Sequence, residues 1–490
     1  IKRFILQIKQ SKPLIITTYN GDYFDFPFLN QRCEFHNLNL SIELGLQADR
    51  KNEIYTGKYL FTHLDCYYWV KRDAFLPQGS HGLKAVTKAK LGYIPIEVDP
   101  EEMVEMGRSN PQHLCEYSVS DAVATYHLYM KHIHDFIFAL CTIVPMTADD
   151  VLRRGSGALC ENLLMAEAYS KQVIFPNKKI EKNEKFYENH LLEAETYVGG
   201  YVECINNGAY RADIPTSFKL KNNKIEETID NVNKIIKFFV EVESNMNFNE
   251  VLNLKEISSN IEDQLLMLLE SVNNSPNQTI ERTPLIYHVD VASMYPNIIL
   301  TNRLQPTAIV DEKKCSHCLF NDPINRCQRN LGWEWRGSYY PLSTNELISI
   351  KASTSNETQY ISAIKQFSQK HYKCNTKTVT LYKENTVCMR ENSFYVDTIR
   401  SFRDLRYSYK ELAKNFYKKA DIARNEGNHE KANEGNTLGV LYDSLQLAHK
   451  IILNSFYGYV MKKGARWYSM EMAGMVTHTG AKIIQASREV

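Results

Sequence analysis

The sequence predicts a multidomain α/β protein, and three observations support this. The chain has 490 residues, which at roughly 150 residues per domain gives about three domains. Hydrophobic residues make up 43% and charged residues 23%, the composition of a globular protein that can bury large cores. Short apolar runs alternate with helical periodicity in the first part of the chain, which is typical of an α/β sheet domain.

The N-terminal part is expected to run strand, turn, helix. Residues 13–18 (PLIITT) fit a short strand, and NGD at 20–22 fits a turn. A helix should begin near Asp25, with Pro27 in its first turn, where the missing N–H is no loss. Further helices are expected over 115–136 and roughly 147–170.

The rest of the chain contains two polar stretches and two long helices. Residues 221–278 are rich in Asn, Lys and Glu and fit a peripheral insertion, and 353–378 form a second polar stretch. Between them, the apolar run at 283–300 predicts a buried strand that ends in a turn at Pro296. A helix over about 398–424 and another that ends at Gly458 in a left-handed cap should form an antiparallel hairpin.

Charge and cysteine content restrict the class of protein. Lys plus Arg total 58 against 57 for Asp plus Glu, so nucleic acid must be bound by a local patch. The longest apolar stretch, around Phe136 to Met146, is far short of the roughly 18 residues of a membrane span, and we expect no membrane partner. The 11 cysteines are too sparse for a disulfide scaffold, which favours a reducing compartment and a metal site.

Three side chains could form a metal-dependent hydrolytic site. Tyr117 and Asp121 are four residues apart on a predicted helix and share one face. If Asp25 faces them, the carboxylates could hold two divalent cations for attack on a phosphodiester, with the Tyr orienting the water. Alternatively, Asp25 is a helix cap and Tyr117 and Asp121 are surface neighbours.

Asp290 interrupts the apolar run LIYHVDV, where an unpaired carboxylate would carry a desolvation cost. A bound Mg²⁺ would compensate it, with the backbone carbonyl of Val291 as a second ligand. Alternatively, Asp290 lies at the exposed end of the strand and caps the next turn. Tyr295, a few residues on, fits either packed core or the floor of a sugar pocket.

Polar stripes follow the two long helices. Lys450, Asn454 and Tyr457 recur at i, i+4 and i+7, a pattern that suits a solvated face or a nucleotide. The other helix has a cationic strip, which favours triphosphate or DNA backbone as its partner; the strip comprises Arg403, Arg406, Lys410, Lys414 and Lys418.

Cys315, Cys318 and Cys327 have metal-ligand spacing. Cys388, Cys374 or His317 could supply a fourth ligand. Thiolate ligation suits either zinc or an iron–sulfur cluster, and the spacing alone does not distinguish them.

These motifs together resemble the family B DNA polymerases over nearly the full chain. TYNGDYFDFPF and YSVSD resemble the second and third exonuclease motifs, and YVGGYVE at 197–203 resembles the motif that links exonuclease and polymerase modules. DVASMYPNIILTNRLQP resembles polymerase motif A, and KIILNSFYGYVMKKGARWYSMEMAG resembles motif B and its continuation. The cysteine set with VCMRENSFYVDTIRSFRD resembles one eukaryotic branch of the family.

The resemblance implies a role for each candidate residue. In the exonuclease, Asp25 and Asp121 would be metal ligands and Tyr117 would position the water. In the polymerase, Asp290 would be a catalytic metal ligand and Tyr295 the steric gate against ribonucleotides. The incoming nucleotide would be bound by the remaining residues of the helical hairpin, with Arg406 and Lys410 on its triphosphate and Lys450, Asn454 and Tyr457 beside them. Cys388 would be the fourth ligand of a [4Fe-4S] cluster.

The resemblance also implies the domain organisation: an RNase H-like 3′→5′ exonuclease followed by a polymerase palm and helical fingers, with an inserted processivity domain. The first exonuclease motif should lie before residue 1 and motif C after residue 490, so the chain is expected to be a piece. The expected segments are exonuclease 1–150, linker and start of palm 151–215, insertion 216–282, palm with motif A 283–314, cysteine site and second insertion 315–390, fingers 391–460 and palm continuation 461–490.

The expected function is template-directed DNA synthesis with 3′→5′ proofreading in nuclear DNA replication, with two Mg²⁺ ions per active site. The expected partners are primer-template DNA, deoxynucleoside triphosphates and accessory subunits of a holoenzyme. One alternative is a stand-alone exonuclease with a decayed polymerase half. Another is a non-catalytic DNA-binding scaffold with a degenerate polymerase fold, against which the presence of Asp25, Asp121, Asp290 and Lys450 counts.

Overall fold

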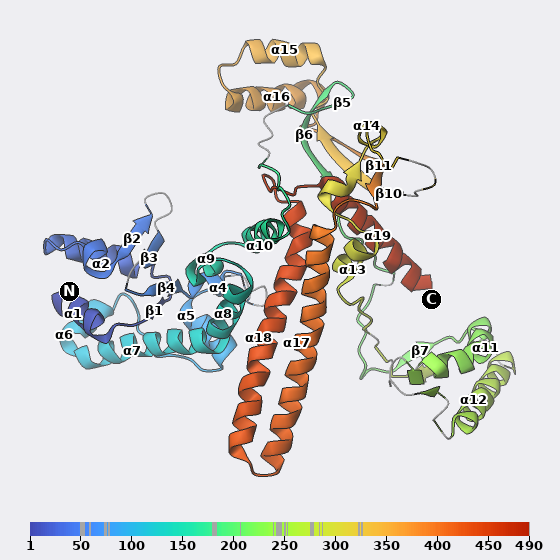
Figure 1. Ribbon diagram of the computed structural model, residues 1–490, viewed down its shortest axis with the longest axis horizontal. Coiled ribbons are helices and arrows are strands. Elements are labelled where there is room, and N and C mark those ends of the chain that lie inside the picture. Colours follow the sequence, from blue (N-terminus) through green and yellow to red (C-terminus); the bar gives the residue numbers. More distant parts are fainter. Residues whose placement is uncertain are drawn as a thin grey trace. The chain divides into compact units, whose positions relative to one another are not determined.

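The computed structural model describes residues 1–490 except 50–53, 58–59, 73–75, 77–78, 179–183, 206, 239, 242–246, 249–250, 252, 275–278, 284, 287, 322–323, 325–326 and 490. The chain divides into two compact units (Figure 1). The larger unit comprises Ile1–Tyr201 and Ser293–Val490, and the smaller comprises Val202–Ala292. The larger unit is therefore assembled from both halves of the sequence.

The N-terminal part of the larger unit is built on a pair of parallel strands. β1 (Ile15–Thr18) lies beside β4 (Thr62–Asp65), with Thr18 opposite Asp65. The crossover between them contains α2 (Asp25–Phe35), α3 (Leu40–Leu44) and the antiparallel pair β2 (Leu46–Asp49) and β3 (Ile54–Gly57). The predicted strand, turn and helix are confirmed. The remaining short helices of this part are α1 (Lys2–Ser11), α4 (Tyr67–Val70), α5 (Leu83–Leu91) and α6 (Met103–Ser109).

The two longer helices predicted here are present with different bounds. α7 (Pro111–Leu128) begins at a proline, and the side chain of Asn110 accepts a hydrogen bond from the backbone N–H of His113 at 3.3 Å. A π-helical turn (Tyr129–Ile133) joins it to α8 (His134–Ile143). The helix predicted over 147–170 is wrong as one helix, because residues 154 and 155 are extended and separate α9 (Ala148–Arg153) from α10 (Ser156–Ser170).

A five-stranded antiparallel sheet forms the next part of the larger unit. Its order is β5 (Phe186–Tyr187), β6 (His190–Tyr197), β10 (Gln328–Tyr339), β11 (Lys377–Cys388) and β9 (Ile309–Val310). β10 and β11 pair along their whole length, from Gln328 opposite Cys388 to Tyr339 opposite Lys377. The helices around the sheet are α14 (Glu312–Ser316), α15 (Thr344–Ala352), α16 (Glu357–Tyr372) and α19 (Met470–Glu489).

The predicted helical hairpin is confirmed as α17 (Phe394–Asn425) and α18 (His429–Val460) (Figure 1). Gly427 takes a positive φ of 72° in the connection, and the Asn428 side chain caps α18. The prediction that Gly458 ends the second helix is wrong, because α18 continues to Val460 and the left-handed glycine is Gly464, with φ of 77°.

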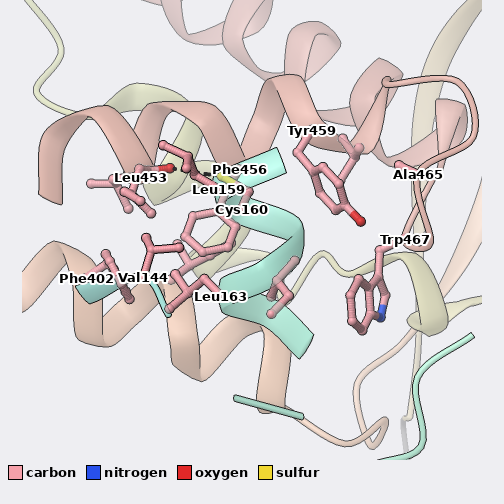
Figure 2. Close-up of a cluster of buried hydrophobic side chains, with 14 of the residues drawn as sticks. Val144, Leu159, Cys160, Leu163, Phe402, Leu453, Phe456, Tyr459, Ala465 and Trp467 are labelled. Carbon is pink, nitrogen blue, oxygen red and sulfur yellow. Dashed lines mark hydrogen bonds between the residues drawn. The ribbon is translucent and has the colours of Figure 1, made fainter. Parts of the chain in front are cut away.

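One hydrophobic core joins the hairpin to the N-terminal part. Cys160 and Leu163 of α10 pack with Leu453 and Phe456 of α18 and with Phe402 of α17 (Figure 2). The base of the hairpin therefore shares a core with the helix that follows the N-terminal part. No described helix combines the length and hydropathy needed to cross a membrane.

The described residues of the smaller unit include two α-helices and a short strand pair. α11 (Asn222–Phe238) packs against α12 (Leu254–Asn274), and Ile225 and Val232 of α11 are buried. β7 (Thr216–Phe218) runs antiparallel to β8 (Ile280–Arg282), with Thr216 opposite Arg282. The ends of the segment that contains the two helices therefore lie next to each other.

The buried strand predicted after β8 is wrong. The described residues of 283–292 are exposed and non-helical, and none of the described strands pairs with them. Since a strand needs a neighbour to accept its backbone hydrogen bonds, an apolar run alone does not produce one. The predicted turn at Pro296 is also wrong, because Pro296 lies in the first turn of α13 (Met294–Thr301), where proline is tolerated.

Candidate active sites

The first candidate site lies where α2 begins. Asp25 is the first residue of this helix and is exposed, and the N-cap position, Phe24, offers no side-chain hydrogen bond. Burial of the carboxyl group and the charge of nearby Asp65 raise the pKa of Asp25, while a backbone hydrogen bond opposes the shift. A carboxylate next to a second carboxylate is suited to a cation.

Asp65, which the sequence reasoning did not single out, fixes the turn before α2. Its fully buried carboxylate accepts hydrogen bonds from the backbone N–H groups of Asn20 at 2.8 Å, Tyr67 at 3.1 Å and Asp22 at 3.3 Å. The sequence contains a usable signal, since Asp65 ends the apolar run FTHLD, as Asp290 ends LIYHVD. A buried carboxylate is expected to have such partners.

Tyr117 and Asp121 form the predicted pair on one face of α7. Burial raises the pKa of Asp121, while hydrogen bonding to Tyr117 and the charge of Lys84 oppose the shift. The Lys84 ammonium lies 5.1 Å from the centre of the Tyr117 ring. One carboxylate oxygen of Asp121, Oδ1, is buried without a hydrogen-bond partner. An orphaned acceptor of this kind fits a site that a cation completes.

The two predicted carboxylate ligands, Asp25 and Asp121, have different neighbours in the structure. Asp25 is influenced by Asp65, and Asp121 by Tyr117 and Lys84. Within the residues that the structure describes, no three His, Cys, Asp or Glu side chains are gathered as metal ligands. A common site for Asp25 and Asp121 therefore stays a prediction.

The second candidate site lies at the base of the helical hairpin, where α13 begins. Ser293 precedes α13 in a left-handed conformation, with φ of 49°. Arg406 of α17 donates a hydrogen bond to the Ser293 hydroxyl at 2.7 Å, and Arg403 contacts the Asn297 side chain at 3.4 Å. The first two members of the cationic strip thus contact the segment of motif A.

Three tyrosines from three distant segments meet beside this contact. The rings of Tyr295 and Tyr457 have centroids 4.5 Å apart, and the hydroxyl groups of Tyr457 and Tyr197 are hydrogen-bonded at 2.7 Å. Burial and the bond to Tyr197 raise the pKa of Tyr457 far above its ordinary value, so it remains a neutral phenol. A Cβ at Gly200 would lie 3.2 Å from the Tyr295 hydroxyl, so the YVGG segment closely approaches this tyrosine.

The remaining predicted nucleotide-binding side chains are open to solvent. Lys410 of α17 and Lys450 and Asn454 of α18 are exposed. Among the described residues, no carboxylate lies within ion-pair distance of Lys410 or Lys450. These two ammonium groups are therefore available to an anion.

Asp290 and Val291 are exposed and belong to the smaller unit. The desolvation argument made from the sequence does not apply to them, because that argument required a buried strand. Their assignment as metal ligands depends on the family resemblance and stays a prediction.

The four predicted cysteine ligands lie at one end of the five-stranded sheet. Cys388 ends β11 opposite Gln328, the neighbour of Cys327, and the Met389 N–H donates to the Cys327 carbonyl at 2.7 Å. Cys315 lies in α14, directly after β9, and the Cys318 N–H donates to the Cys315 carbonyl at 3.0 Å. Cys374 precedes the opposite end of β11, roughly 35 Å along the strand, and is poorly placed as a ligand. All these cysteines are free thiols.

Comparison with known proteins identifies the class to which these sites belong. Residues 1–86 match the exonuclease domain of DNA polymerase family B, and residues 275–490 match DNA polymerase family B itself. The chain belongs to DNA polymerase family B, which confirms the resemblance seen in its motifs.

Curated relatives that the chain matches include catalytic subunits of DNA polymerase epsilon. The chain is 49% identical to one from Arabidopsis thaliana and 48% identical to one from Saccharomyces cerevisiae. Both matches cover 100% of this chain and 23% of the relative, so the chain spans about a quarter of the relatives' length.

A solved structure agrees with the fold. The family B DNA polymerase from the archaeon Pyrobaculum calidifontis matches with a TM-score of 0.54 and 16% identity, over 100% of this chain and 45% of that one. At this level of identity the likeness concerns the fold alone.

Proposed function

We propose that this chain is part of a replicative DNA polymerase that extends a primer with deoxynucleoside triphosphates on a DNA template and excises misinserted ends with a 3′→5′ exonuclease. The observation that carries the proposal is the contact between motif A and the hairpin. Arg406 bonded to Ser293, and Tyr295 packed on Tyr457, bring motif A and motif B residues together. By analogy with the polymerase epsilon subunits that it resembles, the proposed location is the nucleus, and the proposed partners include accessory subunits.

The exposed cations of the hairpin suit the triphosphate. Lys410 and Lys450 would bind phosphate oxygens as point charges, and Arg406 would add a planar guanidinium. Asn454 offers an amide to the same ligand. Because Arg406 already donates to Ser293, its position is linked to that of motif A.

Tyr295 is proposed to select the sugar. Its ring is packed against Tyr457, whose hydroxyl group is held by Tyr197, so the ring has little freedom to move aside for a 2′-hydroxyl. Tyr295→Ala should raise ribonucleotide insertion relative to deoxyribonucleotide insertion, because the steric barrier is removed. Primer extension with each nucleotide alone measures this ratio, and an unchanged ratio would show that Tyr295 serves only as core.

Two Mg²⁺ ions per site fit the oxygen-donor chemistry of the proposed ligands. Asp290 and the Val291 carbonyl would hold the ions of the polymerase site, and Asp25 and Asp121 would hold those of the exonuclease site. The orphaned Oδ1 of Asp121 supports the second assignment. Such ions lower the pKa of the attacking oxygen and neutralise charge on the phosphate. Tyr117, adjacent to Asp121, would orient the attacking water in the exonuclease.

The cysteine set is proposed to hold a [4Fe-4S] cluster, with zinc as the alternative. The four thiols are free, and Cys388 pairs with Gln328, the neighbour of Cys327, which supports a shared ligand role. Among the described residues no three of these side chains are gathered as metal ligands, so the cluster rests on the family resemblance. An absorbance spectrum of anaerobically purified protein separates the two, since iron–sulfur clusters absorb visible light and zinc does not. The smaller unit, together with part of 315–390, is proposed to be a processivity domain that grips duplex product.

The test separates the two activities in the full-length protein. Asp290→Ala should abolish primer extension and leave excision of single-stranded DNA, whereas Asp25→Ala combined with Asp121→Ala should do the reverse. Asp213→Ala, which removes an exposed carboxylate paired with Arg211, is the control and should change neither activity. Metal-dependent extension by the Asp290→Ala protein would refute the palm assignment. Binding of primer-template with neither activity in the unaltered protein would favour a scaffold.

A further inference from the structure

A buried ionic cluster includes the turn that precedes Asp25, and none of the roles proposed above uses it. The Asp22 side chain is fully buried and that of Arg153 is 8% exposed. The Arg153 guanidinium donates to the carboxylates of both Asp22 and Asp149. Charges so far from water persist only when they are paired in fixed geometry.

The cluster ties together four segments of the N-terminal part. Asp22 belongs to the turn between β1 and α2, and Arg153 is the last residue of α9. Asp22 Oδ1 also accepts a hydrogen bond from the Tyr55 N–H of β3 at 2.9 Å. Nη2 of Arg153 lies 3.1 Å from Nδ1 of His63 in β4, whose pKa is lowered by burial. A neutral His63 leaves Arg153 as the cation that faces the two carboxylates.

The cluster is connected to Asp25 through backbone hydrogen bonds. The Asp22 N–H donates to Asp65 at 3.3 Å, and Asp65 is the carboxylate whose charge acts on Asp25. The Phe26 N–H donates to the Gly21 carbonyl at 2.9 Å, so the first turn of α2 is fixed to the same turn. Because Phe24 gives α2 no side-chain cap, the orientation of Asp25 depends on these contacts.

The geometry of Arg153 is specific to a guanidinium. Nη1 of the guanidinium donates to Oδ2 of Asp22, and Nη2 lies 3.5 Å from Oδ1 of the same carboxylate. Nε donates to Asp149. An ammonium group can replace the charge but cannot reproduce three directed N–H groups. Replacing Arg153 by lysine therefore keeps the positive charge and removes the directed hydrogen bonds, so the two contributions can be tested separately.

We propose that Arg153 is a positioning residue for the 3′→5′ exonuclease: through Asp22 it holds the turn at 20–24, and thereby Asp25, in the orientation that excision requires. This inference rests on the exonuclease function proposed above. Arg153 acts through Asp22 and does not touch the DNA.

The experiment compares Arg153→Lys with Arg154→Lys in the full-length protein. Arg154 is the next residue, has a side chain that is 57% exposed and pairs with exposed Asp150, so it provides the same substitution without the cluster. Arg153→Lys should lower kcat for excision of a single-stranded oligonucleotide by about tenfold or more, because small misplacements of reacting groups cost large factors. KM for the oligonucleotide and the rate of primer extension should change by less than about twofold, and Arg154→Lys should change none of these.

A second variant covers the case in which Arg153→Lys does not fold. Asp22→Asn keeps an acceptor for the Tyr55 N–H but loses the charge that Arg153 holds, and it should give the same selective loss of excision kcat. The proposal would be overturned if either folded variant excised at the unaltered rate. It would also be overturned if excision and extension were lost equally and in proportion to the unfolded fraction of the protein. Asp25→Ala, measured in parallel, distinguishes a failure of this inference from a failure of the proposed exonuclease function. Unaltered excision by Asp25→Ala would refute the proposed exonuclease site itself.

Discussion

His449 lies between two aromatic rings in the interior of the hairpin. Its ring centroid is 5.1 Å from those of Phe402 and Tyr409, and Nδ1 is 2.8 Å from the Leu445 carbonyl oxygen. Burial lowers the pKa of His449, and the hydrogen bond to Leu445 only partly opposes this. The unfolded chain therefore binds a proton at a higher pH than the folded chain does.

This shift predicts how stability depends on pH. The contribution of His449 is fully present above its unfolded pKa of about 6.5 and is lost as the pH falls toward its lower folded pKa. Urea unfolding between about pH 5 and pH 8 should show a declining free energy of unfolding on the acid side. His449→Phe should reduce this acid-side decline. His63 and His478, whose pKa values are also lowered by burial, leave a residual dependence, and Asp149, whose pKa is raised to about 6, acts in the opposite direction. A slope that survives His449→Phe intact contradicts the assignment.

The sequence predicted individual residues well where periodicity was enough. Lys450 and Asn454 are exposed on α18, as their spacing indicated. The buried position considered for Asp290 is wrong, because burial depends on partners that an apolar run does not specify, while the alternative of an exposed Asp290 agrees with the structure. Asp22 and Arg153 left no signal at all, since they are 131 residues apart and only the fold joins them.

At the scale of elements, helices were predicted better than strand pairing. The hairpin depends on contacts within about 60 residues and on local periodicity, and both helices are present. The five-stranded sheet pairs β6 with β10, more than one hundred residues later, and no local pattern specifies that register. The ends of helices were predicted less well. Gly458 was expected to end α18, but the helix continues to Val460 although glycine has a low helix propensity.

Close packing of the hairpin gives a prediction with a matched control. A Cβ at Gly435 would lie 3.0 Å from the Ala420 Cβ and 3.1 Å from its backbone nitrogen, so Gly435→Ala must force the two helices apart. We expect a loss of about 1–3 kcal/mol in the free energy of unfolding, reduced by about 1 kcal/mol of improved helix propensity. Gly458, on the same helix, has no atom within 4 Å of the added Cβ, and Gly458→Ala should stabilise by up to about 1 kcal/mol. Urea unfolding measures both, and stabilisation by both variants would contradict the packing argument.

At the scale of the whole molecule, the two units have separate interiors. The large core draws residues from both ends of the chain, from Leu64 to Val476, and none from the described residues of 202–292. The smaller unit buries its own Ile225 and Val232. The Asn-, Lys- and Glu-rich composition of 221–278 falls within this unit, whereas the ends of the unit carry no comparable signal in the sequence.

Separate interiors predict that the smaller unit can be shortened without unfolding the larger one. Thr216 and Arg282 are paired across β7 and β8, and paired residues of antiparallel strands lie about 5 Å apart. A short Gly-Ser linker can therefore replace 217–281 in the full-length protein and leave motif A in the chain. If the smaller unit grips duplex product, the variant should add several-fold fewer nucleotides per binding event, while insertion of a single nucleotide continues.

Ile225→Asp offers an independent control for this deletion, because it places a charge in the interior of the smaller unit and leaves the chain length unaltered. Both variants should show the same loss of processivity, measured by primer extension with a trap that captures dissociated enzyme. Both should also keep the thermal unfolding transition of the larger unit, whose core they do not touch. Unchanged product lengths in both variants would mean that residues 217–281 do not hold the duplex, and the proposed grip would have to be sought on the cationic face of α17.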